Sequence, residues 1–224
     1  MAVGVVVAIA TAGLFVVTHA GADTDRCADF RAAVRERAEL VTGTGRDLLV
    51  IGDSYSVGLG VQPWLSWPTR LPGRVEVEGF SGSGFSRGAS PCGDVSYAAR
   101  ATRSLPYGPG LVVVEGGLND FDEPRSAIRD GFATLMDRLS GRQVLVVGPA
   151  PAPARAAAVP GVDALLARLS RQHGVGYLSM ADAELSYLDD GLHLTPAGHR
   201  EFGDRVAAAV SGGAARTALA RSAG

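Results

Sequence analysis

The sequence contains no lysine, and its 224 residues include only two cysteines and four histidines. Arginine and histidine therefore carry all of the positive side-chain charge, and the formal net charge is -2. Nothing in this balance indicates a nucleic-acid partner. Scattered histidines and so few cysteines form no ligand cluster, so the sequence implies no metal and no cofactor. With 46% hydrophobic and 20% charged residues, the composition excludes a disordered chain and favours a globular domain.

The beginning of the chain is uncharged over a long stretch. Residues 2–17 read "AVGVVVAIATAGLFVV", which is shorter than the ~20 residues that a membrane-spanning helix needs. Small residues follow in "THA" and "AGA", where a signal peptidase can cut. We interpret residues 1–22 as a secretory signal peptide, with a retained membrane anchor or a buried helix of the mature fold as alternatives. The protein is accordingly expected to be secreted or held at the cell envelope.

The two cysteines are Cys27 and Cys92. An even number of cysteines in an exported chain predicts a disulfide, and two unrelated thiols are the alternative. The bridge would tie an N-terminal segment, residues 23–45, to the loop around "SPCGD". The remaining chain divides into one domain over residues 46–211 and a flexible tail over residues 212–224.

Apolar runs alternate with amphipathic stretches through this domain. Strands are predicted at 47–52, 75–80, 111–117, 143–149 and 175–180. Helices are predicted at 124–141, 161–174 and 195–210. Near-continuous Val, Leu and Ile runs suit a parallel sheet that is covered on both faces. The pattern predicts an α/β fold with three α/β/α layers around a central, mostly parallel five-stranded sheet, and a ligand site at the C-terminal strand ends.

Short polar segments follow these strands. Ser54 in "GDSYS" lies at the first strand-to-helix corner and is either a nucleophile or a helix cap. Asp190 and His193 are three residues apart in "DGLH", a spacing that lets a carboxylate reach the imidazole Nδ1–H. Asp189 is at the wrong distance for this role, and Asp53 is more consistent with a structural acid at the corner. Together, Ser54, His193 and Asp190 supply a nucleophile, a base and an orienting acid for acyl transfer.

Acyl transfer also needs donors for a developing oxyanion. The backbone N–H of Ser54 lies at a helix start, where such groups are unpaired. Gly82 in "GFSGSG" can bring its N–H close because it has no side chain, and Asn119 in "GGLND" can offer its amide. Loop flexibility and turn chemistry are the alternatives for these two residues.

These four segments resemble, in order, the four blocks of the SGNH (GDSL) hydrolase family, over roughly residues 46–210. The resemblance implies a flavodoxin-like fold, with Ser54 as nucleophile and first oxyanion donor. It implies Gly82 as the second donor, with Gly84 as runner-up, and Asn119 as the third. Gly117 would form the turn, and Asp190 and His193 would complete the triad. Tyr55 stands where the family has the Leu of its name, which leaves pocket size open.

The expected activity is that of an exported serine esterase acting on a small-molecule or glycan ester, as a monomer. One alternative is an O-acyltransferase or deacetylase that acts on cell-wall glycan with the same site. Another is a non-catalytic cell-surface binding module. His199, in the last helix, is expected to pack or cap, and Glu115 could support the site from beneath. Residues 85–110, with Phe85, Tyr97 and Tyr107, are expected to shape the acyl pocket.

Overall fold

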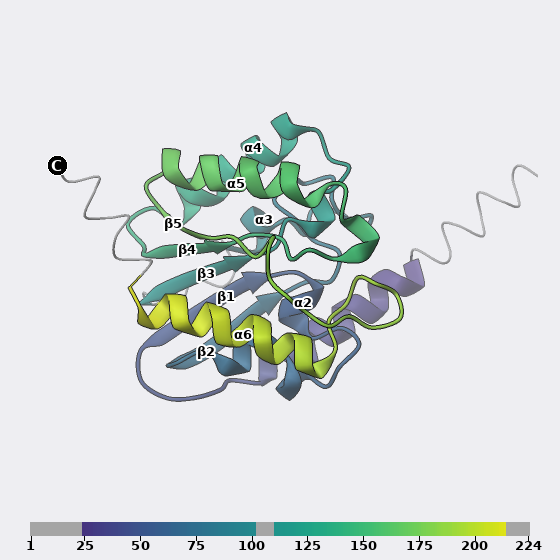
Figure 1. The fold of residues 1–224 in the computed structure, drawn as a ribbon, viewed down its shortest axis with the longest axis vertical. Coiled ribbons are helices and arrows are strands. Elements are labelled where there is room, and N and C mark those ends of the chain that lie inside the picture. Colours follow the sequence, from purple (N-terminus) through teal and green to yellow (C-terminus); the bar gives the residue numbers. More distant parts are fainter. Residues whose placement is uncertain (1–23, 102–109, 214–224) are drawn as a thin grey trace, which may run out of the picture.

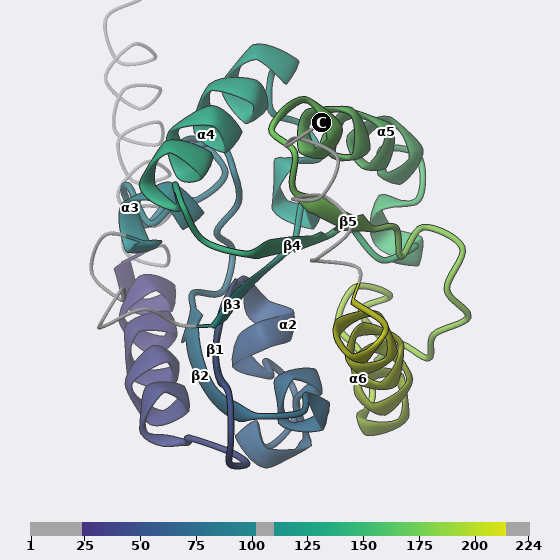
Figure 2. The same cartoon turned by 90° about the vertical axis from the view of Figure 1, so that its left-hand side faces the viewer.

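The computed structural model of the chain describes residues 24–101 and 110–213. Five strands form one sheet in the order β2-β1-β3-β4-β5, and every pairing is parallel. Helices lie on both sides of this sheet (Figure 1, Figure 2). The α/β fold with three layers and a parallel five-stranded sheet is thus confirmed. The strands are β1 Asp47–Gly52, β2 Arg74–Gly79, β3 Leu111–Glu115, β4 Val144–Val147 and β5 Gly176–Leu178.

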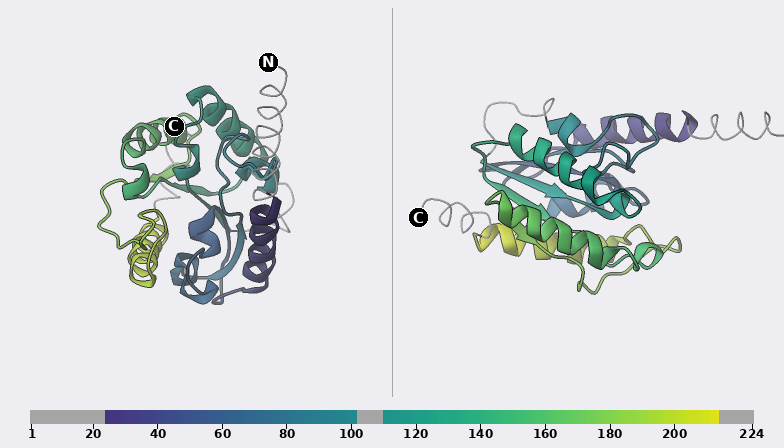
Figure 3. Two further views of the ribbon diagram at one scale, coloured as in Figure 1. Left: turned by 90° about the vertical axis from the view of Figure 1, so that its right-hand side faces the viewer. Right: turned by 90° about the horizontal axis from the view of Figure 1, so that it is seen from above.

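The α-helices cover the two faces of the sheet with separate apolar cores. One core joins alternate residues of β1, β3 and β4 to α3, α4 and α5. The other joins the intervening residues to α6 and to the segment around Trp67. Figure 3 shows this layering from two further sides. The α-helices and short 3-10 helices are α2 Ser54–Val57, η1 Pro63–Leu65, η2 Trp67–Arg70, α3 Tyr97–Ala101, η3 Leu118–Asp120, α4 Arg125–Arg138, η4 Pro153–Arg155, α5 Val159–Gln172 and α6 Pro196–Ser211.

The strands end one or two residues away from several predicted limits. The clearest case is β3, which was predicted to reach residue 117 but ends at Glu115. Gly116 and Gly117 follow it with φ of +148° and +110°. These positive φ angles turn the chain out of the sheet, and glycine tolerates them because it has no Cβ. The glycine pair therefore places the following residues above the strand end.

The register of the strands aligns their C-terminal ends. Gly52 pairs with Gly79 across β1 and β2, Ile51 pairs with Val114 across β1 and β3, and Glu115 pairs with Val147. The segments that follow these strands therefore leave the sheet at one edge. This edge is where an open parallel sheet places its ligand site.

The N-terminal part of the described chain is a helix that extends to residue 39. A disulfide joins Cys27 of this helix to Cys92, with 5.5 Å between the two Cα atoms. Phe30 packs edge-on against Phe80, with the ring centroids 6.2 Å apart. Among the described residues, no helix is long and apolar enough to cross a membrane. The predicted signal segment 1–22 and most of the predicted tail lie outside the described residues.

Candidate active site

The corner after β1 places Ser54 at the start of α2. Asp53, not Ser54, is the N-cap of this helix, and its Oδ1 accepts a hydrogen bond from the N–H of Tyr55 at 3.0 Å. The capping role that sequence reasoning left open for Ser54 is therefore taken by the preceding acid. Ser54 is 7% exposed at the first helical position. Its hydroxyl is not needed for capping.

Asp190 and His193 contact one another in the loop before α6. The imidazole Nδ1 of His193 lies 2.6 Å from Oδ2 of Asp190. Oδ1 of the same carboxylate accepts the backbone N–H groups of Leu192 and His193, each at 2.9 Å. Slight burial tends to raise the pKa of Asp190, but hydrogen bonds from His193 and Leu192 outweigh it and lower the pKa to about 2. Asp190 is therefore ionised at neutral pH and holds the Nδ1–H tautomer, which leaves Nε2 as an acceptor.

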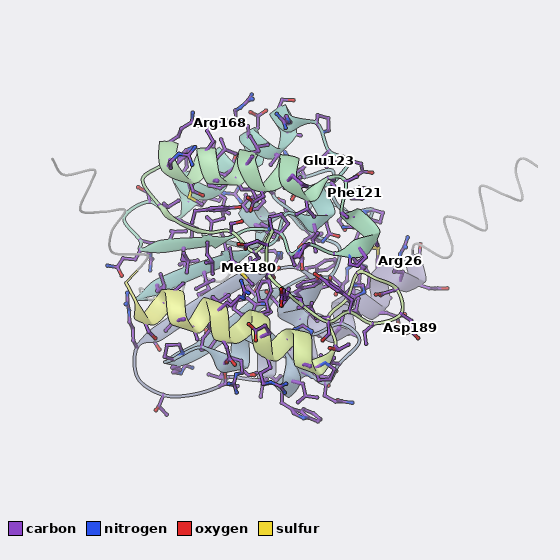
Figure 4. The ribbon with its side chains drawn as sticks, viewed as in Figure 1. Arg26, Phe121, Glu123, Arg168, Met180 and Asp189 are labelled. Atoms are coloured by element: carbon purple, nitrogen blue, oxygen red, sulfur yellow. A yellow bond between two sulfur atoms is a disulfide. The ribbon has the colours of Figure 1, made fainter. Side chains whose placement is uncertain are left out.

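Asp189 occupies a different position in the same loop. It is exposed and lies at the periphery of the molecule (Figure 4). The imidazole contact belongs to Asp190.

Tyr55 connects the serine corner to the histidine loop. Its hydroxyl donates a hydrogen bond to the carbonyl of Leu192 at 2.5 Å, and its ring centroid is 6.5 Å from that of His193. No hydrogen bond between described residues joins the Ser54 hydroxyl to the imidazole. Catalytic hydrogen bonds are often long in ligand-free enzymes and tighten when substrate binds. Sequence reasoning treated Tyr55 only as a replacement for Leu and missed this anchoring contact.

Two backbone N–H groups are free at the strand ends. Within the described residues, neither Ser54 nor Gly82 donates its N–H to an acceptor. Gly82 has a φ of +79°, which a side chain would disfavour. Gly84 is enclosed instead, since a Cβ there would come within 2.5 Å of Oδ2 of Asp120. Gly82 is thus the less enclosed of the two glycines.

The amide of Asn119 is held from both sides. Its Nδ2 donates to the carbonyl of Ser83 at 2.9 Å and, at a longer 3.2 Å, to Oδ2 of Asp53. Its Oδ1 accepts from Nη1 of Arg155 at 2.8 Å. The left-handed turn at Gly117 brings this short helix, η3, back toward the β1 corner. The structure therefore places Asn119 beside the residue that precedes Ser54.

Buried acids lie beneath the corner. Burial raises the pKa of Asp53 to about 6, although the N–H of Tyr55 and the charges of His193 and Arg155 act in the opposite direction. Glu115 is also buried, and burial together with Asp53 raises its pKa well above the usual range. Its Oε2 accepts a hydrogen bond from Ser56 at 2.6 Å. Glu115 therefore supports α2 from the sheet, through Ser56 and not through Ser54.

The aromatic residues expected to shape an acyl pocket lie in the core, although the Tyr97 hydroxyl reaches the corner, 3.5 Å from Oδ2 of Asp53. Phe85 and Tyr97 are fully buried, with ring centroids 4.9 Å apart and Phe85 stacked on Phe132. That expectation is wrong for these two residues, because the apolar core between the sheet and α4 takes them. Tyr107 lies outside the described residues. Among the described residues, no group of three or more His, Cys, Asp or Glu side chains is placed to hold a metal ion.

Comparison with known families agrees with this geometry. The sequence profile of the GDSL-like lipase/acylhydrolase family matches residues 50–201, which is more than half of the chain. The chain belongs to this family. As a GDSL-like acylhydrolase it is a hydrolase, and the matched range includes the serine corner, the Asn119 turn and the histidine loop.

Solved structures with the same fold include several esterases. The carbohydrate acetylesterase Est24 of Sinorhizobium meliloti is 20% identical, with a TM-score of 0.59 over 75% of this chain and 99% of its own. An aryl esterase of M. smegmatis is 22% identical, with a TM-score of 0.57 over 75% and 99% of the two chains. Another carbohydrate acetylesterase family member from Sinorhizobium meliloti is 19% identical, with a TM-score of 0.62 over 74% and 97%. A comparison with curated protein sequences finds no match. At these sequence identities, the three structures share the fold of this GDSL-like chain, and the likeness shows no more than that.

Arg155 is the other residue at this edge that sequence reasoning missed. It lies in η4, within the Pro-rich connection that follows β4. Its position after a strand end, at the same edge as the other candidate residues, is the signal that could have drawn attention to it.

Proposed function

We propose that the chain is an exported serine esterase that hydrolyses carboxylic esters through an acyl-enzyme on Ser54. Nε2 of His193 takes the proton of the Ser54 hydroxyl while Oγ attacks the ester carbonyl. The imidazolium then gives this proton to the leaving alcohol as the C–O bond breaks. Water, deprotonated by His193, attacks the acyl-enzyme, and the returned proton restores Ser54 as the acid is released.

Asp190 sets the roles of the two imidazole nitrogens of His193 in this scheme. Its ionised carboxylate, 2.6 Å from Nδ1 of His193, keeps Nε2 free to accept a proton and stabilises the imidazolium as it forms. This contact, in a loop that Tyr55 fastens to the Ser54 corner, is the single observation that carries the proposal. The oxyanion would be held by the N–H groups of Ser54 and Gly82 and by the Asn119 amide.

Export is supported by two separate features. The described chain contains a disulfide between Cys27 and Cys92, and such bonds form and persist in oxidising compartments. The uncharged segment over residues 2–17 precedes it.

The structural neighbours named above include esterases of carbohydrate acetyl and aryl esters, which favours small ester substrates for the first assays.

The Ser54→Ala variant tests the mechanism. It should lose p-nitrophenyl acetate hydrolysis by roughly 1,000-fold or more, because removing a triad nucleophile leaves only binding and oxyanion stabilisation. A fluorophosphonate probe should label the wild type and leave Ser54→Ala unlabelled. The matched control is Ser56→Ala, two residues further along α2. This variant loses a hydrogen bond to Glu115 and should still be labelled by the probe. Near-wild-type turnover by a folded Ser54→Ala protein would end the proposal.

A further inference from the structure

The turn that carries Arg155 lies between the two halves of the candidate site. The N–H of Ala154 donates to the carbonyl of Gly191 at 2.9 Å, so the turn touches the loop of Asp190 and His193. On the other side, Nη1 of Arg155 donates to the carbonyl of Leu118 at 2.5 Å and to Oδ1 of Asn119 at 2.8 Å. One three-residue turn thus contacts both the histidine loop and the loop of the proposed oxyanion donor.

The guanidinium of Arg155 is itself fixed in place. Its central carbon lies 4.4 Å from the ring centroid of Phe121, a cation–π distance. Phe121, labelled in Figure 4, immediately follows η3 and is 44% exposed. Half-buried between this ring and η3, Arg155 keeps part of its side chain out of water. The Arg155 guanidinium is therefore held by contacts with Phe121 and η3 and is not free to rotate in solvent.

The contact with Asn119 decides which way the amide faces. A side-chain amide has an acceptor oxygen and a donor nitrogen of nearly the same shape, and a half-turn exchanges them. Guanidinium is a donor only, so Arg155 can donate a hydrogen bond to the amide oxygen of Asn119 and cannot pair with its NH2 group. The Nδ2 group is then directed to the opposite side, toward the carbonyl of Ser83 and the carboxylate of Asp53. Both hydrogens of this group are thus engaged, and the longer contact, to Asp53 at 3.2 Å, is the one that a substrate oxyanion would replace.

The charge of Arg155 acts in the same direction. Asp53 is a buried acid directly before the nucleophile, and the positive charge of Arg155 is among the influences that lower its pKa against the effect of burial. An ionised Asp53 also attracts the N–H side of Asn119 and repels its oxygen. Both the hydrogen bond from Arg155 and the negative charge of Asp53 therefore favour one orientation of the Asn119 amide.

We propose that Arg155 is a positioning residue of the oxyanion hole: it holds Oδ1 of Asn119 so that the amide N–H faces the ester oxygen as negative charge develops there. Without Arg155 the amide can reverse and present its oxygen to the oxyanion. The effect should appear in the chemical step and not in substrate binding, because charge on the ester oxygen develops only in the transition state. The proposal rests on the esterase mechanism given above.

A double-mutant cycle tests the proposal. Asn119→Ala should lower kcat by about 100- to 1,000-fold, as expected for an oxyanion donor. Arg155→Ala should lower kcat by about 10-fold with KM little changed, a loss within the range of coupled neighbours. In the Asn119→Ala background, Arg155→Ala should cost nothing further. Arg155→Lys keeps a positively charged donor group without the planar fork and should recover part of the loss. The control, Arg87→Ala, removes an exposed arginine that pairs with Asp94 and should leave kcat unchanged.

Each outcome of the cycle supports or overturns a defined statement. Equal losses on removing Arg155 in the presence and absence of Asn119 would show that the two act independently, and would overturn the positioning role alone. Wild-type kcat in Arg155→Ala would do the same. Full activity in Ser54→Ala would overturn the esterase mechanism and this proposal together, so the two failures are distinguishable.

Discussion

At the scale of single residues, Asp190 and Asp189 are adjacent in the chain but differ in their contacts. Only Asp190 contacts the imidazole of His193. Asp190→Asn should therefore lower kcat by about 1,000- to 10,000-fold, because an amide at this position can favour the wrong imidazole tautomer. Initial rates on p-nitrophenyl acetate at saturating substrate would measure the loss.

Asp189→Asn is the matched control. It makes the same change of one acid to one amide in the same loop, at an exposed residue, and its turnover should stay close to that of the wild type. A crippled Asp189→Asn alongside an active Asp190→Asn would reverse the assignment of the orienting acid.

The candidate residues at this scale could be predicted because their chemistry is visible in short spacings. The three-residue interval between Asp190 and His193 suits a local contact, and the structure has that contact. Tyr55 and Arg155 could not be found in this way. Their partners, Leu192 and Asn119, are distant in sequence, and such contacts depend on how the loops meet above the sheet.

At the scale of elements, the helix that ends at residue 39 is fastened beside the Gly82 loop. The Cys27–Cys92 disulfide closes a separation of 65 residues, and Phe30 lies close to both Phe80 and Gly82. On the chain-entropy model, a closure of this length stabilises by about 4 kcal/mol. The Cys27→Ser/Cys92→Ser double variant should lose about that much free energy of unfolding, measured by urea denaturation.

Reduction provides the matched comparison for this pair. Wild type unfolded in the presence of dithiothreitol should match the double variant, because both lack the closure in the unfolded state. If the oxidised wild type and the double variant unfold at the same urea concentration, the bridge does not stabilise the fold as argued. The position of the helix could not be predicted from sequence, because a cysteine count gives a pairing but not a packing partner.

At the scale of the whole molecule, the strand order and layers follow from general rules of parallel sheets. Near-continuous apolar runs predicted strands that are buried on both faces, and alternating residues of β1 do belong to the two separate cores. The sequence could not show that Phe85 and Tyr97 would fill one of these cores, since an aromatic in a loop suits a pocket equally well. Their burial depends on the whole packed layer of α3 and α4.

The stability of the whole molecule should depend on His199 at acid pH. This histidine is 1% exposed in the first turns of α6, its ring centroid 6.1 Å from that of Tyr55. Within the described residues, neither ring nitrogen has a hydrogen-bond partner. Burial, and to a smaller extent the charge of His193, lower the pKa of His199 from 6.5 to about 4. The folded state therefore resists a proton that the unfolded state accepts.

The sign of the effect follows from this difference. Between pH 6.5 and about 4 the unfolded state binds the His199 proton and the folded state does not, so stability falls as pH is lowered. Asp53, whose pKa is raised to about 6, contributes with the opposite sign, so the contribution of His199 must be isolated by substitution.

The His199→Phe variant removes the titrating imidazole. From pH 7.5 to pH 4, the free energy of unfolding of the wild type should fall by about 3 kcal/mol more than that of the variant. Urea unfolding of both proteins at the two pH values measures the difference. Parallel pH dependence in wild type and His199→Phe would show that the buried imidazole does not resist protonation.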